Sequence, residues 1–533
     1  MTDQLPENIT CGEATIRLLE QYGVTTVFGI PGVHTLDLCR GLDKGVRHIQ
    51  CRNEQGAGFM AEGWARATGE PGVAIVISGP GVTNAATAIG QSYCDSLPLL
   101  LISAEAASYT IGKGWGVLHE VTEQKKVTEP LTALSATART VADVPFLLAQ
   151  AFTIFASKRP RPVHISIPID VQAELVRDNW AAVKLPGRPS PDQHLVSKAA
   201  DLLKESYLPI IMVGGGAVLA AKSVTKLANA LGAIVITSTA GKGIVPDDHP
   251  LSLSASTSRP EVLSLISKAD VILAVGTELS ETDSFVERMD ISGKIIRVDI
   301  DSAKINDFYP AEIGIVGDAN ITLQLLNDLL SNHQTFIRKK SQQMVGEVRQ
   351  QITANLTRPE QQHSQYLDLM RSIATTDTIW SGDACQLVYT GAFAFPVQSP
   401  RQWFYPAGYC ALGNALPNAI GAKLARPDTP VVVLAGDGGF MFTMPELVTA
   451  AQLKLPIPIV IWENGGLKQI QDDMDNASIS RVGVEGINPD FVALAKACYC
   501  HAVRTTGPEN FENVFAEAFN ADRPTVIVIE EKR

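Results

Sequence analysis

Short apolar runs alternate with longer, alanine-rich segments along almost the whole chain. Runs typical of buried strands occur at residues 73–77, 99–102, 210–213, 234–237, 271–275, 295–298, 431–434 and 457–461. The segments between these runs have the length and composition of helices. This alternation is typical of βα units and therefore predicts parallel sheets flanked by helices.

Two stretches interrupt the alternation. Residues 180–194, WAAVKLPGRPSPDQH, are rich in proline and polar side chains, and the charged stretch 332–365 has no strand pattern. We interpret both as linkers. They predict three doubly wound α/β domains with parallel sheets, at residues 1–182, 190–335 and 360–533.

The first and last domains share a pattern, which predicts a duplicated fold. In each, an Ala/Gly-rich helix leads to an apolar strand, a glycine turn, a second helix and a second strand. The spacing from Gly56 to Gly79 in the first domain equals the spacing from Gly413 to Gly436 in the last.

Composition excludes several classes of partner. The net charge of −12 disfavours a broad surface for nucleic acid or an anionic membrane. The eight cysteines lack paired CxxC zinc spacing, which fits reduced thiols in a cytosol. The N-terminus has no basic segment leading into an apolar run, and no apolar run could span a bilayer. We expect a cytoplasmic protein with no nucleic-acid or membrane partner.

The two duplicates differ in the chemistry of their glycine turns. The first carries GPG where the last carries GDG, with Asp437 at its centre, and Asn464 follows the next strand of the last domain. Ligands of parallel sheets bind beyond the carboxyl ends of the strands. We therefore expect Asp437 and Asn464 to lie at adjacent strand ends, on the ligand side.

A carboxylate, an amide oxygen and a nearby carbonyl are hard oxygen ligands that suit Mg²⁺ or Ca²⁺ rather than zinc. The following helix would point its N-terminus at a bound anion, and Gly436, Gly438 and Gly439 would let the backbone approach it. The sequence thus predicts a site for a metal ion and a phosphate group. The ordinary alternative is an aspartate that only caps a helix.

The segment GDGGFMFTMPELVTAAQLKLPIPIVIWENGG, which carries these residues, resembles the motif of thiamine-diphosphate enzymes, although Glu463 replaces the first asparagine of the closing pair. Similarity to the acetolactate synthase and 2-oxo acid decarboxylase superfamily extends over nearly the whole chain, through FGIPGVHTL, CRNEQGAGFMAEGWARATG, SGPGVTN and ALGNALPNAIGAKLA. The resemblance implies that Asp437, Asn464 and the carbonyl of Gly466 bind Mg²⁺, which holds the diphosphate.

The resemblance also implies the other half of the site. Glu54, in CRNEQGAG, matches the family glutamate that activates the coenzyme through its aminopyrimidine ring. Leu412 matches the apolar residue that keeps the coenzyme bent, although it could equally be a core leucine. In this superfamily the glutamate and the metal site of one centre come from different subunits, which implies a homodimer or homotetramer.

The expected reaction is decarboxylation of a 2-oxo acid, with electrons taken up by the coenzyme. FGIPGVHTLDLCRGL and GKGWGVLHEVTEQ look most like the branch that decarboxylates 5-guanidino-2-oxopentanoate (2-ketoarginine). His119 aligns with a glutamine near the substrate in acetolactate synthases, and His34 follows the IPG turn. His119 is a candidate proton donor, and His34 is a second candidate catalytic residue in the same cleft. The ordinary alternative for a lone histidine is a structural role.

A guanidinium tail requires a carboxylate partner. Glu281 and Asp283, which follow a predicted strand of the middle domain, are our candidates, although an ordinary acidic loop is the simpler interpretation. Lys468 weighs against this substrate, because a lysine near the pocket would repel a guanidinium unless it points to solvent.

The main alternative is a carboligase like acetolactate synthase. Acetolactate synthases bind FAD in the middle domain as a structural cofactor. Here VGGGAV, at residues 213–218, does not complete the GxGxxG motif, so we do not favour an FAD or NAD site. A catalytically inactive nucleotide-binding or regulatory relative is disfavoured by the presence of Glu54, Asp437 and Asn464.

Overall fold

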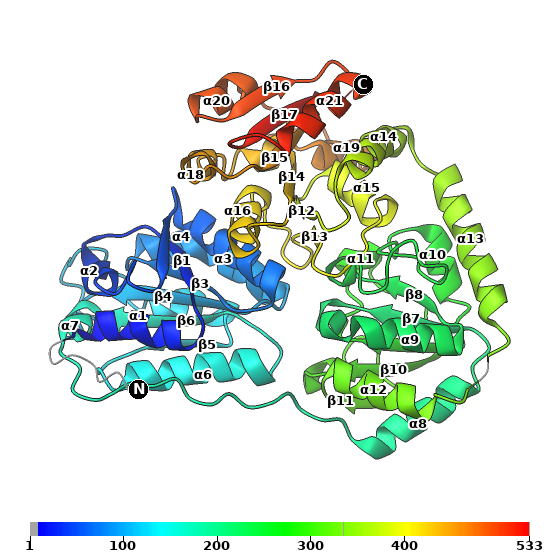
Figure 1. Cartoon of the computed structure of the whole chain (residues 1–533), viewed down its shortest axis with the longest axis horizontal. Coiled ribbons are helices and arrows are strands. Elements are labelled where there is room, and N and C mark those ends of the chain that lie inside the picture. Colours follow the sequence, from blue (N-terminus) through cyan, green and yellow to red (C-terminus); the bar gives the residue numbers. More distant parts are fainter. Residues whose placement is uncertain (1–8, 334, 532–533) are drawn as a thin grey trace.

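The chain forms three parallel β-sheets within the residues that the structure, a computed structural model, describes, namely 9–333 and 335–531. Figure 1 shows them as three bodies around the centre of the molecule, coloured blue to cyan, green, and yellow to red. This confirms the prediction of three α/β domains. The expectation of no signal peptide falls largely on residues 1–8, which lie outside the described residues.

The first sheet has the strand order β2-β1-β3-β4-β6-β5. Its strands are β1 (Thr26–Gly29), β2 (Arg47–Gln50), β3 (Gly72–Val76), β4 (Leu99–Glu105), β5 (Leu134–Thr137) and β6 (Val163–Pro168). The helices are α1 (Cys11–Gln21), α2 (Leu36–Cys39), α3 (Glu54–Thr68), α4 (Pro80–Cys94), α5 (Lys125–Thr128), α6 (Asp143–Ser157) and α7 (Ile169–Ala173). The central strands β3 and β4 are buried along their whole length, as expected for a sheet covered on both faces.

The last sheet repeats this topology, with the order β13-β12-β14-β15-β17-β16. Its strands are β12 (Ile379–Gly382), β13 (Trp403–Phe404), β14 (Val431–Gly436), β15 (Pro458–Glu463), β16 (His501–Arg504) and β17 (Thr525–Glu530). Its helices are α15 (Gln386–Ala394), α16 (Ala415–Ala425), α17 (Asp437–Phe440), α18 (Glu446–Gln452), α19 (Lys468–Asn476), α20 (Phe491–Ala497) and α21 (Pro508–Ala518). The predicted duplication of the first and last domains is confirmed.

The middle sheet has the order β11-β10-β9-β7-β8. Its strands are β7 (Pro209–Val213), β8 (Ile234–Thr237), β9 (Val271–Val275), β10 (Lys294–Asp299) and β11 (Ile313–Val316). The helices are α8 (Gln193–Lys204), α9 (Ala221–Leu231), α10 (Pro260–Ile266), α11 (Glu281–Ser284) and α12 (Ala319–Leu329). Apolar side chains cover both faces of this sheet.

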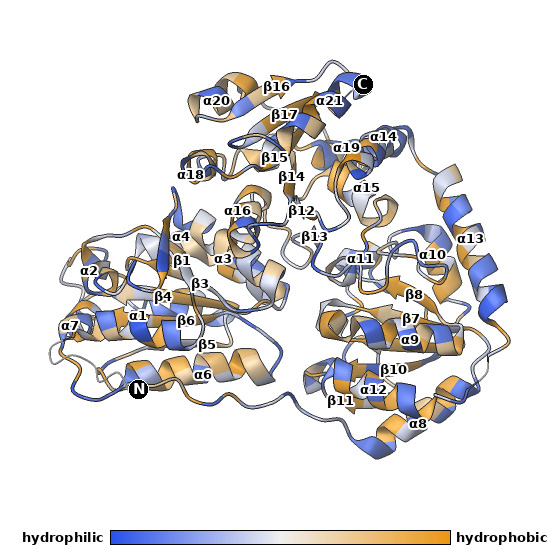
Figure 2. Ribbon diagram, in the orientation of Figure 1, coloured by the Kyte–Doolittle hydropathy of each residue, from blue (hydrophilic) through white to orange (hydrophobic). Residues whose placement is uncertain are grey.

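The charged stretch expected to be a linker is mostly helical. It forms α13 (Arg338–Ala354) and the start of α14 (Arg358–Ile373). Figure 2 shows that α13 is largely hydrophilic, but Val345, Val348 and Ile352 pack into the core of the middle domain. This sparse i, i+3, i+7 stripe is enough to hold a surface helix.

The first and last domains pack closely through α3 and α16. A Cβ atom on Gly63 would lie 2.1 Å from the carbonyl oxygen of Asn418, and one on Gly421 would lie 2.0 Å from that of Met60. Glycine at these positions therefore permits the two backbones to approach. In the described part of the chain, no helix has the length and apolar character needed to cross a membrane.

Candidate active site

Asp437 lies where the buried strand β14 turns into α17, and its side chain is only 1% exposed. Its Oδ1 accepts a hydrogen bond from the backbone N–H of Gly438 at 2.9 Å. Its Oδ2 accepts from the N–H groups of Gly465 at 2.8 Å and Gly466 at 3.1 Å. The loop after β15 therefore closes directly onto the Asp437 carboxylate, as the prediction of adjacent strand ends requires.

Asn464 and Gly466 belong to this loop. Strand β15 runs beside β14 with Trp462 opposite Gly436, so Asn464, the first residue after β15, lies one residue beyond the level of Asp437. Gly466 has φ of 122°, and a Cβ atom there would lie 2.5 Å from the carbonyl oxygen of Val484. Only glycine fits such a position without strain.

The residues fit a hard divalent cation. Asp437 supplies a buried carboxylate, and the loop that donates to it carries the half-buried Asn464 and the carbonyl of Gly466. Asp437 has no salt bridge within residues 9–333 and 335–531. A Cβ atom on Gly438 would lie 3.1 Å from Leu467 Cδ2, so the glycine turn keeps the backbone close to the loop. Oxygen donors of this kind suit Mg²⁺. Magnesium binding itself remains a prediction.

Leu412 lies close to the same turn. The next residue, Gly413, donates its N–H to the Asp383 carboxylate, at 2.9 Å to Oδ2. A Cβ atom on Gly439 would lie 3.1 Å from that carboxyl group. Leu412 itself is half-buried and belongs to none of the apolar clusters of the described residues, and its contact with a coenzyme stays a prediction.

Sequence reasoning missed Asp383, which follows β12. Its carboxyl group is 1% exposed, and burial raises its pKa to about 7. Its position after a strand neighbouring β14 was the available signal, but β12 itself was not among the predicted strands.

Asn488 was also missed. Its Nδ2 donates to Asp437 Oδ2 at 2.8 Å and to Glu463 Oε1 at 3.3 Å. Glu463, the residue that replaces the expected asparagine, pairs with Arg504 through its other oxygen. Asn488 therefore bridges two carboxylates on neighbouring strands. It lies in an irregular loop with no motif that could have identified it.

Glu54 is the first residue of α3 and is 8% exposed. The preceding Asn53 caps the helix by accepting the N–H of Gln55 at 2.8 Å. Glu54 Oε2 accepts a hydrogen bond from Asn84 Nδ2 at 2.8 Å. Asn84, on α4, is therefore a further residue that orients Glu54.

His34 and His119 lie together. Their ring centroids are 5.2 Å apart in an edge-to-face arrangement. His34 Nδ1 lies 2.6 Å from Ser78 Oγ, and burial, with a smaller contribution from the nearby His119, lowers the pKa of His34. His119 Nδ1 is buried without a partner among the described residues.

The loop that carries His119 is anchored by Gln124, which is 2% exposed. Gln124 Oε1 accepts the N–H of Gly79 at 2.7 Å, and its Nε2 donates to the carbonyl of Ala104 at 2.7 Å. The carbonyl of His119 itself would lie 2.6 Å from a Cβ atom on Gly79. In the first domain, the GPG turn therefore contacts the loop that carries His119, whereas the matching GDG turn of the last domain carries the Asp437 carboxylate.

Glu281 and Asp283 lie on α11 of the middle domain. Asp283 Oδ1 accepts hydrogen bonds from the N–H of Thr239 at 2.8 Å and from its Oγ1 at 3.1 Å, while Glu281 is exposed. Burial raises the pKa of Asp283. Asp283 thus has a structural partner already, and its role as a ligand for the substrate tail stays a prediction.

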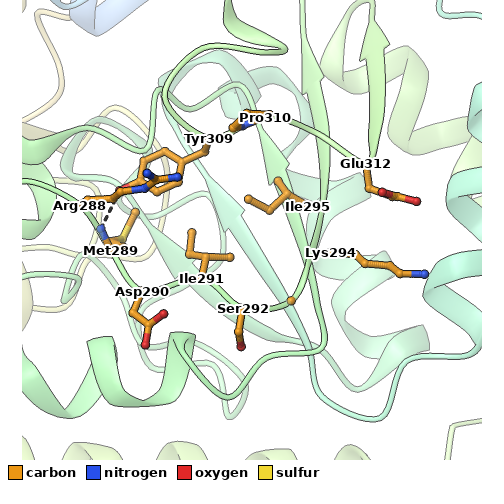
Figure 3. Close-up of a pocket in the computed structure, with 11 residues that line it drawn as sticks. Arg288, Met289, Asp290, Ile291, Ser292, Lys294, Ile295, Tyr309, Pro310 and Glu312 are labelled. Atoms are coloured by element: carbon orange, nitrogen blue, oxygen red, sulfur yellow. Dashed lines mark hydrogen bonds between the residues drawn. The ribbon is translucent and has the colours of Figure 1, made fainter.

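The middle domain contains a cavity of about 570 Å³. Figure 3 shows that it is lined by the segment before β10, which includes Arg288, by Lys294 at the start of that strand, and by Tyr309. It lies at the amino end of β10, opposite the edge where parallel sheets bind ligands. The VGGGAV glycines have a packing reason: a Cβ atom on Gly214 would lie 2.3 Å from the carbonyl oxygen of Gly276. An FAD site in the middle domain stays untested, and the sequence does not favour it.

The candidate residues form two separate groups in one chain. Among residues 9–333 and 335–531, no hydrogen bond or salt bridge joins Glu54, His34 or His119 to Asp437 or Asn464. The structure pairs His34 with His119, and it joins Asp437 to the loop that carries Asn464 and Gly466.

Comparison with known proteins identifies the family to which this fold and the Asp437 site belong. Residues 9–127 match the thiamine pyrophosphate enzyme N-terminal TPP binding domain, residues 196–326 the central domain and residues 383–529 the C-terminal TPP binding domain. The chain belongs to the thiamine pyrophosphate enzymes.

Curated relatives cover almost the full chain. A probable 2-ketoarginine decarboxylase of Pseudomonas aeruginosa is 45% identical over 528 residues, which cover 98% of this chain and 94% of that protein. The acetolactate synthase isozyme 3 large subunit of Escherichia coli is 32% identical, with 98% and 94% covered. A probable acetolactate synthase large subunit of Methanocaldococcus jannaschii is 31% identical, with 97% and 91% covered.

Proposed function

We propose that the protein is a thiamine-diphosphate- and Mg²⁺-dependent decarboxylase that converts 5-guanidino-2-oxopentanoate to an aldehyde and CO₂ without oxidation. The observation that carries this proposal is the buried Asp437 carboxylate closed in by the Asn464–Gly466 loop. The 45% identity to a probable 2-ketoarginine decarboxylase supports the substrate.

The candidate residues divide the work of binding the metal ion, holding the coenzyme and moving protons. Asp437, Asn464 and the carbonyl of Gly466 would hold Mg²⁺, and Gly436, Gly438 and Gly439 would admit the diphosphate. Leu412 would support the coenzyme, and Glu54 would share a proton with its pyrimidine ring. Bound thiamine diphosphate supplies the nucleophilic carbon and the electron sink for decarboxylation. His119, with His34 beside it, would move a proton at the reacting carbon.

We propose a homodimer or homotetramer in the cytoplasm, with each centre completed by two subunits. Exposed apolar side chains close to the histidine pair and to the Asp437 turn support this arrangement: Val33, Leu118, Met441, Phe442 and Val482. Such side chains are typical of surfaces that a partner covers. The domain limits 182, 190, 335 and 360 are part of the same proposal.

The pairing of Lys468 bears on a cationic substrate. Lys468, which weighed against this substrate, forms a salt bridge with Asp472.

A carboligase is the second candidate, favoured by the similarity to acetolactate synthases. The deciding experiment supplies purified protein with Mg²⁺ and thiamine diphosphate, then follows CO₂ and carbonyl products from 2-ketoarginine and pyruvate in parallel. We expect an aldehyde and CO₂ from 2-ketoarginine. Acetolactate from pyruvate would instead establish the carboligase, and loss of activity on chelation, reversed by Mg²⁺, would test the metal.

A further inference from the structure

Glu446, the first residue of α18, has a buried carboxylate that reaches into the first domain. It is 1% exposed. Its Oε1 accepts the backbone N–H of Arg52 at 2.9 Å and that of Asn53 at 3.1 Å. Its Oε2 accepts the hydroxyl of Thr449 at 2.6 Å. The two amides immediately precede Glu54 and would have no helical partner of their own.

Gly56 leaves the space that this contact needs. A Cβ atom on Gly56 would lie 2.3 Å from Glu446 Oε1. Any larger residue at position 56 would therefore displace the carboxylate from the two amides. Glycine destabilises α3, and the hydrogen bonds of Glu446 must offset that loss of stability.

The hydrogen bonds that the Glu446 carboxylate accepts are strong. Hydrogen bonds to an ionised acceptor are shorter and about twice as strong as neutral ones. Burial raises the pKa of Glu446, whereas the hydrogen bonds from Thr449 and from the amides of Arg52 and Asn53 favour its ionised form. A second contact across the same junction, from Arg52 Nη2 to Gln452 Oε1 at 2.5 Å, is exposed and involves only side chains.

We propose that Glu446 is a positioning residue for Glu54. It fixes the main chain at Arg52 and Asn53, so that the first turn of α3 presents the Glu54 carboxylate in one place. Asn84 then holds that carboxylate from the other side. The proposal rests on the proposed function, because it gives Glu54 the proton-sharing role.

The first test needs no cofactor. Amide hydrogen exchange is measured by mass spectrometry in the full-length apo protein, for peptides covering Arg52 and Asn53. Glu446→Leu removes the acceptor, and exchange of the two amides should rise about tenfold or more. Glu446→Gln keeps an oxygen acceptor and should stay within about threefold of wild type. Gln452→Ala is the matched control and should leave exchange unchanged.

The second test measures the consequence for Glu54. Exchange of the C2 proton of bound thiamine diphosphate with deuterium is followed by NMR, without substrate. Glu446→Leu should slow it about tenfold or more, while Glu446→Gln and Gln452→Ala stay within about threefold. If Glu446→Leu fails to fold, Gly56→Ala replaces it, because its Cβ displaces the carboxylate while favouring the helix.

The outcomes separate the two proposals. Unchanged amide exchange in Glu446→Leu, or faster amide exchange with normal C2 exchange, would overturn the positioning role while leaving the proposed function intact. Normal C2 exchange in Glu54→Gln would overturn the role of Glu54, and the positioning role with it. Loss of C2 exchange in Glu54→Gln together with slowing in Glu446→Leu supports both.

Discussion

Asn488 donates one hydrogen bond to Asp437 and a second to Glu463, and so separates two carboxylates at the ends of adjacent strands. Like charges this close repel each other in a poorly solvated site. The amide group of Asn488 and the guanidinium of Arg504, which pairs with Glu463, offset that repulsion. The replacement of the expected asparagine by Glu463 is therefore accommodated by residues outside the motif.

We expect Asn488→Leu to weaken binding of Mg²⁺ and thiamine diphosphate by about ten- to a hundredfold, the usual cost of losing a residue that orients a metal ligand. The Asp437 carboxylate would lose a donor and face Glu463 directly. Calorimetric titration of the apo protein with Mg²⁺ and thiamine diphosphate measures the change. Asn513→Leu, on the exposed face of α21, is the control. Unchanged affinity in Asn488→Leu would contradict this role.

Glu54→Gln should lower turnover by about 10²- to 10⁴-fold, the range typical for losing an acid–base group. The amide cannot share a proton with the pyrimidine ring, but it can still accept the hydrogen bond from Asn84. Steady-state kinetics at saturating cofactor measures the effect, and an unchanged melting temperature shows that the fold is retained. The exposed Glu70→Gln, just beyond α3, should behave like wild type. Comparable turnover in the two variants would refute the role of Glu54.

The fold was largely predictable from sequence because its central strands are continuous apolar runs. All eight predicted strands exist, among them β3, β14 and β15. Strands at or near the sheet edges were not identified: β2 is partly exposed and carries Arg47 and Gln50, so its sequence lacks an apolar run. The helix α13 was missed because only a narrow stripe of its surface is apolar.

The site was predictable only where a motif marks it. Asp437 and Asn464 follow predicted strands, so their proximity could be inferred from sheet geometry. Asn488 and Glu446 act through loops and a domain junction whose positions depend on tertiary packing. The pairing of His34 with His119 likewise depends on how the loop anchored by Gln124 folds back over Gly79.

Asp472→Asn should raise the KM for 2-ketoarginine by about two- to fivefold, with little change in kcat. A partly exposed ion pair contributes about 0.2–1 kcal/mol. Without Asp472, the Lys468 charge at the start of α19, next to the predicted metal loop, would be left to repel a guanidinium tail. Steady-state kinetics with the wild type and variant measures the shift.

The matched control for this prediction is Asp473→Asn on the same helix, because Asp473 accepts a hydrogen bond from Gln469 and pairs with no lysine among the described residues. It should leave the KM unchanged. An equal effect of Asp472→Asn on pyruvate, which has no cationic tail, would show that the lysine charge does not act on the guanidinium.

Two buried histidines predict a loss of stability in acid. His164 is fully buried between Ser103 and Thr128, and burial lowers its pKa from 6.5 to about 3. His363 is buried beside Thr390, and its pKa is lowered to about 4. The unfolded chain takes up these protons as the pH falls below 6.5, whereas the folded chain does not. The free energy of unfolding should therefore fall by about 1.4 kcal/mol per pH unit for each histidine, between pH 6 and 4.5.

Urea denaturation at several pH values measures this slope. His164→Gln keeps polar groups for Ser103 and Thr128 but does not titrate, so the slope for unfolding of the first domain should drop by about 1.4 kcal/mol per pH unit. His363→Gln should lower the slope for unfolding of the last domain by the same amount, and each change should leave the slope of the other domain as it is. The exposed His194→Gln is the control and should leave both slopes unchanged. A His164→Gln slope equal to that of wild type would mean that His164 gains its proton in the folded protein as readily as in the unfolded chain.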